Sequence, residues 1–330
     1  MPSKIELSAQ IDEAFKGKRI VIAGDAVADQ FLLGTISRVS REAPVFILRH
    51  DETQTAPGGA ANAAVNVAAL GGTPVLIGVT GKDADGDALR SKLEAAGVGC
   101  SMLLAAEGVR TTTKMRVLAG QHYAPRQQVI RIDFEDQAGL NIDIRHRLRQ
   151  DLLTAGETAD AIVISDYDYG VADAELFAAA HDIARRRDIP LLIDSRFRLA
   201  EFAGATTATP NSEEVEELIG KDFSPADCDE LRRRLGFESM LVTCGNKGVI
   251  LTERSREPLL IPAAGSTEPV DVTGAGDTVI AVFSLALAAG FDRATAARIA
   301  NHAGGIVVMK KGTASVTAAE LKASLAAYAE

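Results

Sequence analysis

The chain has 330 residues and a mass of 34.7 kDa, is 47% apolar and 24% charged, and has a mean hydropathy of +0.08. This composition is typical of a globular protein and excludes a disordered, collagen-like or coiled-coil chain. The net charge of −10 and the lack of a Lys/Arg run of the kind that tracks a nucleic-acid backbone argue against a nucleic-acid partner.

Strands and helices alternate along most of the chain. Short apolar runs predict strands at 18–25, 74–80, 161–165, 190–194 and 240–243, and the segments between them predict helices at 60–70, 85–96, 174–187 and 212–219. Two further strands, at 249–252 and 259–262, precede helices at 275–289, 294–310 and 317–328. This order predicts an α/β fold with a mostly parallel sheet flanked by helices.

Two segments, about 34–56 and 111–135, do not fit this pattern, because apolar and polar residues alternate along them. Alternation predicts half-buried strands, so we expect a small β-sheet that projects from the main body as a lid or dimer surface. No internal repeat or low-complexity linker is present. We therefore expect one domain over residues 1–330 that carries this lid.

Cysteine usage and hydropathy indicate the compartment. The three cysteines, Cys100, Cys228 and Cys244, lie far apart and form no CxxC pair, which favours a reducing environment. The first fifteen residues contain no apolar stretch of the signal-peptide kind, and glycine and proline interrupt the one long charge-free segment, 53–81. We expect a cytoplasmic protein with no membrane contact.

The most specific local signal is DVTGAGD at residues 271–277, directly before an apolar helix. A turn of small residues at a helix N-terminus exposes backbone N–H groups that can hold an anion. Asp277 would sit in the first helical turn, where the helix dipole favours its ionised form, as a general base requires. The alternative is a tight turn with an ordinary helix cap. The segment does not fit the GxGxxG motif of dinucleotide-binding Rossmann folds, because Val279 stands at the position of the third glycine, where a small residue is needed.

A second signal is PGGAAN at residues 57–62, which we expect to open a helix. Gly58 and Gly59 would let a ligand approach the backbone, and the Asn62 amide can both donate to and accept from a sugar hydroxyl. The alternative is a common turn in which Asn62 bonds nearby backbone.

Together these motifs resemble the signatures of the PfkB (ribokinase-like) carbohydrate kinases, with Val272 in place of the usual threonine. The resemblance extends over nearly the whole chain and implies a ribokinase-like three-layer sandwich with a β-sheet lid. It also implies ATP- and Mg²⁺-dependent phosphorylation of a sugar hydroxyl. Asp277 would be the base, and the amides of Gly274, Ala275 and Gly276 would stabilise charge on the transferred phosphoryl group.

The same resemblance implies further ligand contacts. Asp25 and Asp29 match the substrate-binding carboxylate region, with strand-end capping as the alternative. In the N-x-x-E motif Asn211 would contact phosphate and Glu214 would hold Mg²⁺ through water, although an N-capped helix fits the same residues. The remaining implied contacts are Thr243, Gly245, Lys247 and Gly248 along the ATP phosphates, Asn301 near adenine, and Asp271 and Thr273 at a possible K⁺ site.

Within the family the chain looks closest to the D-glycero-D-manno-heptose 7-phosphate kinases, on the stretches 37–45, 113–117, 129–133 and 165–167. The distal phosphate of such a substrate needs cations. The candidate substrate contacts are Arg38, Lys114, Arg116, Arg131 and Asp166. For the lid cations the alternative is a solvated face or salt bridges across a lid homodimer, which the resemblance also suggests.

Three departures concern this branch. Tyr169 and Arg196 replace two lysines that the branch usually has, and residues 121–127 look like a small insertion. Many bacterial relatives also carry a nucleotidyltransferase with an HxGH-type motif, which this sequence does not contain. Another sugar or nucleoside kinase, and a non-catalytic sugar-binding regulator on the same scaffold, therefore remain alternatives.

Overall fold

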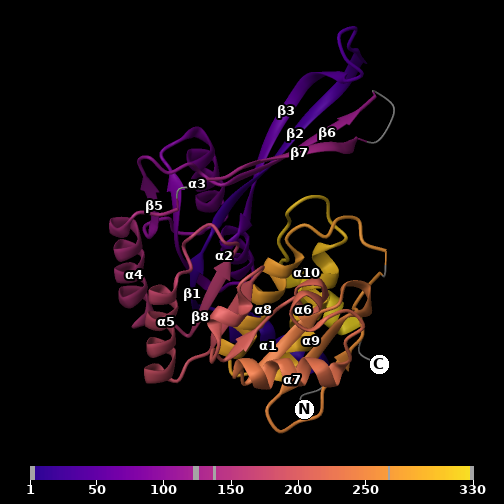
Figure 1. Cartoon of the computed structure of the whole chain (residues 1–330). Coiled ribbons are helices and arrows are strands. Elements are labelled where there is room, and N and C mark those ends of the chain that lie inside the picture. The colour runs from indigo at the N-terminus through magenta and orange to yellow at the C-terminus, as the bar shows by residue number, and fades with distance from the viewer. Residues whose placement is uncertain (1–3, 122–125, 137–138, 267, 328–330) are drawn as a thin grey trace.

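The computed structural model describes residues 4–121, 126–136, 139–266 and 268–327 (Figure 1). In this part of the chain nine strands form one sheet: β1 (Arg19–Gly24), β4 (Thr73–Gly81), β5 (Leu103–Ala106), β8 (Ala161–Asp166), β9 (Leu191–Ser195), β10 (Thr207–Ala208), β11 (Ser239–Thr243), β12 (Val249–Glu253) and β13 (Leu259–Ile261). Their order is β13-β12-β11-β10-β9-β8-β1-β4-β5. Neighbouring strands are parallel except at β12, which is antiparallel to both neighbours.

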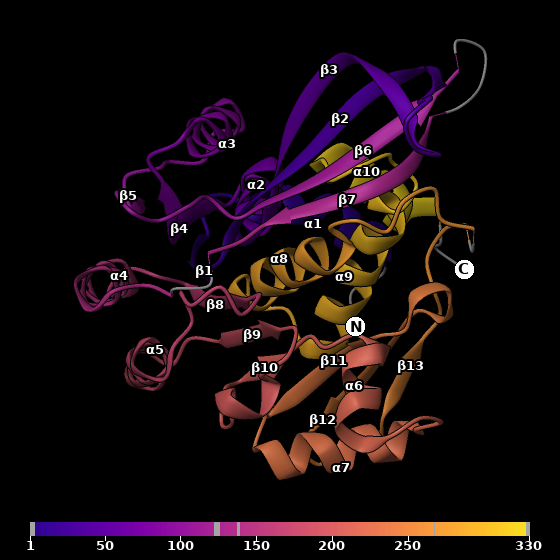
Figure 2. The same ribbon diagram turned by 45° about the horizontal axis from the view of Figure 1, so that its top comes forward.

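Helices cover both faces of this sheet, which confirms the predicted three-layer α/β fold (Figure 2). One face carries α1 (Lys4–Phe15), α2 (Ala60–Ala69), α8 (Ala275–Ala288), α9 (Arg293–Val307) and α10 (Ala318–Ala327). The other carries α4 (Ile142–Gly156), α5 (Ala174–Arg187), α6 (Ser212–Ile219) and α7 (Pro225–Leu235). The helix α3 (Ala84–Ala95) packs beside β4, and none of the described helices is long and apolar enough to cross a membrane.

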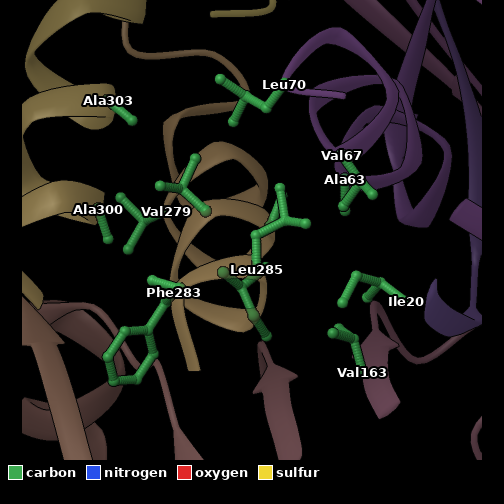
Figure 3. Close-up of a cluster of buried hydrophobic side chains, with 14 of the residues drawn as sticks. Ile20, Ala63, Val67, Leu70, Val163, Val279, Phe283, Leu285, Ala300 and Ala303 are labelled. Atoms are coloured by element: carbon green, nitrogen blue, oxygen red, sulfur yellow. The ribbon is translucent and has the colours of Figure 1, made fainter. Parts of the chain in front are cut away.

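Helix α8 lies at the centre of one hydrophobic core. Every residue of α8 from Asp277 to Ala286 is buried, and Val279 lies beside Ala300 of α9 (Figure 3). A helix that is apolar on all sides is stable only when neighbours surround it, here α2, α9 and the strands β1, β8 and β9. This packing against β1, β8 and β9 holds the N-terminus of α8 rigidly in place.

A second sheet of four strands projects from this body (Figure 1). Its described strands are β2 (Ala26–Val39), β3 (Phe46–Gly59), β6 (Thr113–Gly120) and β7 (Gln127–Phe134), in the order β3-β2-β6-β7. We call it the lid sheet. It begins at Ala26, earlier than the predicted residue 34, because the base of β2 is buried and lacks the alternation on which the prediction depended. Residues 122–125 of the predicted lid and insertion lie outside the described residues.

The segment PGGAAN opens α2 at Ala60 as predicted, and its first three residues are the end of β3 and not a common turn. Gly58 pairs with Val27 and Gly59 pairs with Ala26, and α2 starts at the next residue. Gly59 has a φ of 58°, and a Cβ there would lie 2.6 Å from the carbonyl oxygen of Asp25. Only glycine allows the chain to pass from strand to helix so close to β1.

The sequence analysis missed the helices α1, α4 and α7. In α4 the buried residues Ile144, Leu148 and Leu152 recur at helical spacing, and that periodicity could have found it. Helix α7 begins with Pro225 after the capping residue Ser224, which is a second overlooked start signal.

Candidate active site

Asp277 lies in the first turn of α8 and its carboxylate is buried. The Asn62 side-chain amide donates to Oδ2 at 2.9 Å, and the Tyr167 hydroxyl donates to Oδ1 at 2.7 Å. Burial raises the pKa of Asp277 to about 6, although these two hydrogen bonds act to lower it. A buried carboxylate with a pKa near neutrality suits a group that takes up and releases a proton.

Asn62 is held in one orientation by its own helix. Asn66 donates to both the backbone oxygen and Oδ1 of Asn62, at 3.0 and 3.1 Å, and Oδ1 of Asn66 accepts from the Val316 amide. The Asn62 nitrogen therefore faces α8, where it also donates to the Gly274 carbonyl at 3.2 Å. The amide connects distant parts of the chain and does not serve only its local backbone.

In the turn before α8 the Ala275 amide donates to the Val272 carbonyl at 3.2 Å, and the amides of Gly274 and Gly276 have no partner among the described residues. Gly274 is the N-cap residue with a φ of 78°, and among the described side chains none caps this helix. A Cβ on Gly274 would lie 2.5 Å from Nδ2 of Asn62, whereas a Cβ on Gly276 would meet nothing within 4 Å. Asp271 braces the turn by accepting from the amides of Thr273 and Gly312. Free amides at a helix N-terminus can hold an anion, and because no described side chain caps α8 the turn keeps the feature on which the predicted anion site depends.

A groove runs from this turn along α9. Its lining includes Thr243, Gly245, Gly248, Gly276 and Asn301. The groove is mostly apolar, with Val249, Val272, Val279 and Val308 in its walls. These residues fit a nucleotide whose base lies in the apolar part and whose phosphates reach the amides before α8. Lys247 is exposed and does not line the groove.

Acidic side chains gather beside Gly276. Glu214, Asp194 and Asp166 line a cleft with Thr243 and Gly276. Glu214 forms a full capping box with Asn211, which is the N-capped helix given as the alternative for the N-x-x-E motif. Burial raises the pKa of Glu214 to about 7. Sequence reasoning missed Asp194, although it stands at the end of β9 as Asp25 stands after β1; burial also raises its pKa.

These acids fit a hydrated Mg²⁺ ion. Among the described residues no three metal-ligating side chains lie close enough to enclose a cation. Magnesium keeps several waters and is commonly held by one or two carboxylates together with substrate phosphates. Glu214 and Asp194 would be those carboxylates, at the edge of the groove where the phosphates end.

Two predicted substrate contacts mainly hold loops. The Asp25 carboxylate accepts from the backbone amides of Tyr167, Tyr169 and Val171 at 2.8 to 3.2 Å, and burial raises its pKa to about 6. Asp166 accepts from the Ser195 hydroxyl at 2.7 Å and from Arg198. Both carboxylates thus shape the loops that follow β8 and β9.

The base of the lid sheet brings Asp29 and several cations over the site. Asp29 pairs with Arg116 at 2.6 Å and accepts from the Thr313 hydroxyl at 2.9 Å. Lys114 is buried beside the Tyr167 ring, with Nζ 4.9 Å from its centre, and burial lowers the pKa of this lysine. Arg131 pairs with Asp133.

The structure does not bring every predicted cation to the site. Arg38 is exposed near the outer end of β2, at roughly 30 Å along the strand from Asp29. Tyr169 and Arg196, which replace expected lysines, do line the same cleft as Lys114 and Arg131.

A family model described as pfkB family carbohydrate kinase matches residues 33–319. The chain belongs to the pfkB family. It is therefore an ATP-dependent carbohydrate kinase, as the two glycine motifs predicted. The match includes Asn62, the turn before α8 and Asp277.

The similar proteins include two named bifunctional protein HldE. This kinase is 40% identical over 315 residues to that of Hahella chejuensis, covering 93% of this chain and 63% of the relative. It is 39% identical over 326 residues to that of Caulobacter vibrioides, covering 96% and 65%. The chain thus spans just under two thirds of the length of these relatives.

Solved structures of sugar kinases share the fold. Arabidopsis thaliana ribokinase complexed with ribose and ATP has a TM-score of 0.72 at 20% identity, covering 94% of this chain and 99% of its own. Escherichia coli phosphofructokinase-2 in complex with potassium has a TM-score of 0.74 at 19% identity, with the same coverage. These neighbours confirm the expected ribokinase-like architecture.

Replacing Asp277 by asparagine should stabilise this kinase at neutral pH. Because the pKa of Asp277 is higher in the folded chain than its ordinary 3.8, its ionisation disfavours folding, and this cost disappears as the pH falls from about 6 toward 4. Asp277→Asn should raise the free energy of unfolding at pH 7.5 by about 1–3 kcal/mol. Urea unfolding at pH 7.5 and 4.5 measures this gain, which should shrink at the lower pH. A variant less stable than wild type at pH 7.5 would contradict the prediction.

Proposed function

We propose that this kinase transfers the γ-phosphoryl group of ATP to the anomeric C1 hydroxyl of D-glycero-D-manno-heptose 7-phosphate, giving the 1,7-bisphosphate. The observation that carries the substrate class is Lys114. It is a buried cation with no ion-pair partner among the described residues, and it lies against Tyr167, which contacts Asp277. Since an unpaired buried charge is costly, an anionic group of the substrate is its natural partner.

Asp277 would act as the general base. Its carboxylate takes the proton of the sugar hydroxyl while the hydroxyl oxygen forms a bond to the γ-phosphorus and the bond to the β–γ bridging oxygen breaks. ADP leaves with the bridging oxygen, and Asp277 later releases its proton to solvent. The amides of Gly274, Ala275 and Gly276 would neutralise the charge on the transferred group, with the Ala275 amide exchanging its hydrogen bond to the Val272 carbonyl for one to the phosphate.

The metal ions have distinct proposed places. Bound Mg²⁺ supplies charge neutralisation on the phosphates, and Glu214 with Asp194 would hold it through water. A monovalent cation such as K⁺ would lie at the loop of Asp271 and Thr273, where hydrogen bonds from Thr273 and Gly312 keep the pKa of Asp271 low despite the raising effect of burial. A structural neighbour was solved in complex with potassium, which supports a monovalent cation in this proposal.

The distal phosphate would lie in the cleft of Lys114, Arg131, Tyr169 and Arg196. Arg196 lines this cleft and can bind a phosphate through two donors, so it can replace the lysine of the heptose kinase branch. The HldE relatives support a heptose phosphate. Another phosphorylated sugar remains the alternative within the family.

ADP release with ATP and Mg²⁺ tests the substrate directly. The panel is D-glycero-D-manno-heptose 7-phosphate, the same heptose without phosphate, fructose 6-phosphate, ribose and adenosine, each with KCl or NaCl. We expect turnover of the heptose phosphate, faster in KCl, and none with Asp277→Asn. Turnover of another sugar and not of the heptose phosphate would show that the heptose phosphate is not the substrate. A fully active Asp277→Asn would overturn the base assignment.

Lys114→Met tests the phosphate-binding cleft. Loss of one charge-assisted hydrogen bond should raise the KM for the sugar phosphate roughly 10- to 100-fold, while the KM for ATP stays within about twofold. The matched control is Lys16→Met, an exposed lysine after α1 that should change neither constant. Equal losses for the phosphorylated and unphosphorylated heptose would show that Lys114 does not bind the phosphate.

The outer face of the lid sheet supports a homodimer. Ile130 and Ile132 are 54% and 39% exposed and, by strand register, point away from the face of Lys114 and Arg116. A second lid sheet could cover these residues and Phe46. We expect a dimer by light scattering, and the double variant Ile130→Lys/Ile132→Lys should be a monomer. A monomeric wild type would contradict this proposal.

A further inference from the structure

Tyr167 is a residue of the site to which no role has been assigned. It follows β8 directly, and its hydroxyl lies 2.7 Å from Oδ1 of Asp277. The Asn62 side-chain amide donates to the other carboxylate oxygen, Oδ2. Asp277 therefore receives two neutral donors from two different elements, one on each oxygen.

The Tyr167 ring is held from several sides. Its backbone amide donates to Asp25 at 2.8 Å, which fixes the start of the loop. A Cβ on Gly59 would approach the ring edge to 3.3 Å, so the glycine leaves the ring its place. Lys114 covers a ring face with Nζ 4.9 Å from the ring centre. The hydroxyl thus has one accessible position, against Asp277.

We propose that Tyr167 is a positioning residue for phosphoryl transfer, because its hydroxyl orients the Asp277 carboxylate and stabilises its ionised form. The inference rests on the proposed role of Asp277 as base. Each carboxylate oxygen has two lone pairs. With Asn62 and Tyr167 each taking one, the carboxylate cannot rotate freely and presents a remaining lone pair to the sugar hydroxyl.

The charged surroundings of Asp277 define what Tyr167 adds. The negative charges of Asp29 on β2 and Asp194 on β9 disfavour ionisation of Asp277, and the positive charge of Lys114 on β6 favours it. Burial is the largest effect and raises the pKa of Asp277. Asn62 and Tyr167 are the two hydrogen-bond donors that lower it. Removing one donor should leave the base protonated to a higher pH.

The test is Tyr167→Phe, which retains the ring and removes only the hydroxyl. We expect kcat to fall roughly tenfold or more, the loss of one hydrogen bond to a charged group, with the KM for ATP unchanged. The acidic limb of the profile of kcat/KM against pH should move up by about one unit. Thermal unfolding and ATP binding report whether the variant is folded.

Tyr169→Phe is the matched control on the same loop. Its hydroxyl donates to Glu135 of the lid sheet region and not to Asp277, so it should leave the acidic limb in place whatever it does to the sugar KM. An unmoved limb in Tyr167→Phe would overturn the proposal. A higher kcat/KM would also overturn it, since the hydroxyl would then compete with the substrate for Asp277. Activity remaining in Asp277→Asn would instead overturn the base assignment.

Discussion

The hydrogen bond from Asn62 to Asp277 is the contact on which the site depends. It joins α2, which follows the lid strand β3, to α8, which lies in the centre of the core. Because Asn66 and the Val316 amide fix Asn62, the orientation of the Asp277 carboxylate depends on packing between helices. Glycine at position 274 is required by the same contact, since any side chain there would displace the Asn62 nitrogen.

Electrostatics set the second constraint. A chain with net charge −10 has concentrated Asp25, Asp194, Glu214 and Asp277 in or beside one site, and burial raises the pKa of each. These carboxylates oppose folding at neutral pH, and such a cost is typical of an active site that uses destabilised groups. The compensating positive charge comes from the lid sheet and from the amides before α8, which face the cleft and the groove.

The elements that could be predicted are those whose start or end is determined by residues close together in the sequence. Helix α6 was predicted with its observed ends because Asn211 and Glu214 form a capping box at its start and Gly220 follows its last residue. Helix α8 followed from a glycine turn before an apolar run. The base of β2 was not found, because residues buried on both faces lose the alternation that marks a strand at an exposed sheet. Helix α4 carried a usable periodicity that was overlooked.

The amino-acid sequence by itself determined the family and the two glycine motifs, and it singled out Asp277 as the candidate base, because each is encoded in a few adjacent residues. Only the tertiary structure decided which polar groups meet. It brought Tyr167 onto Asp277, committed Asp25 to backbone amides and left Arg38 far from the site. These outcomes depend on strand register and on the close packing of elements distant in the chain, which adjacent residues do not encode.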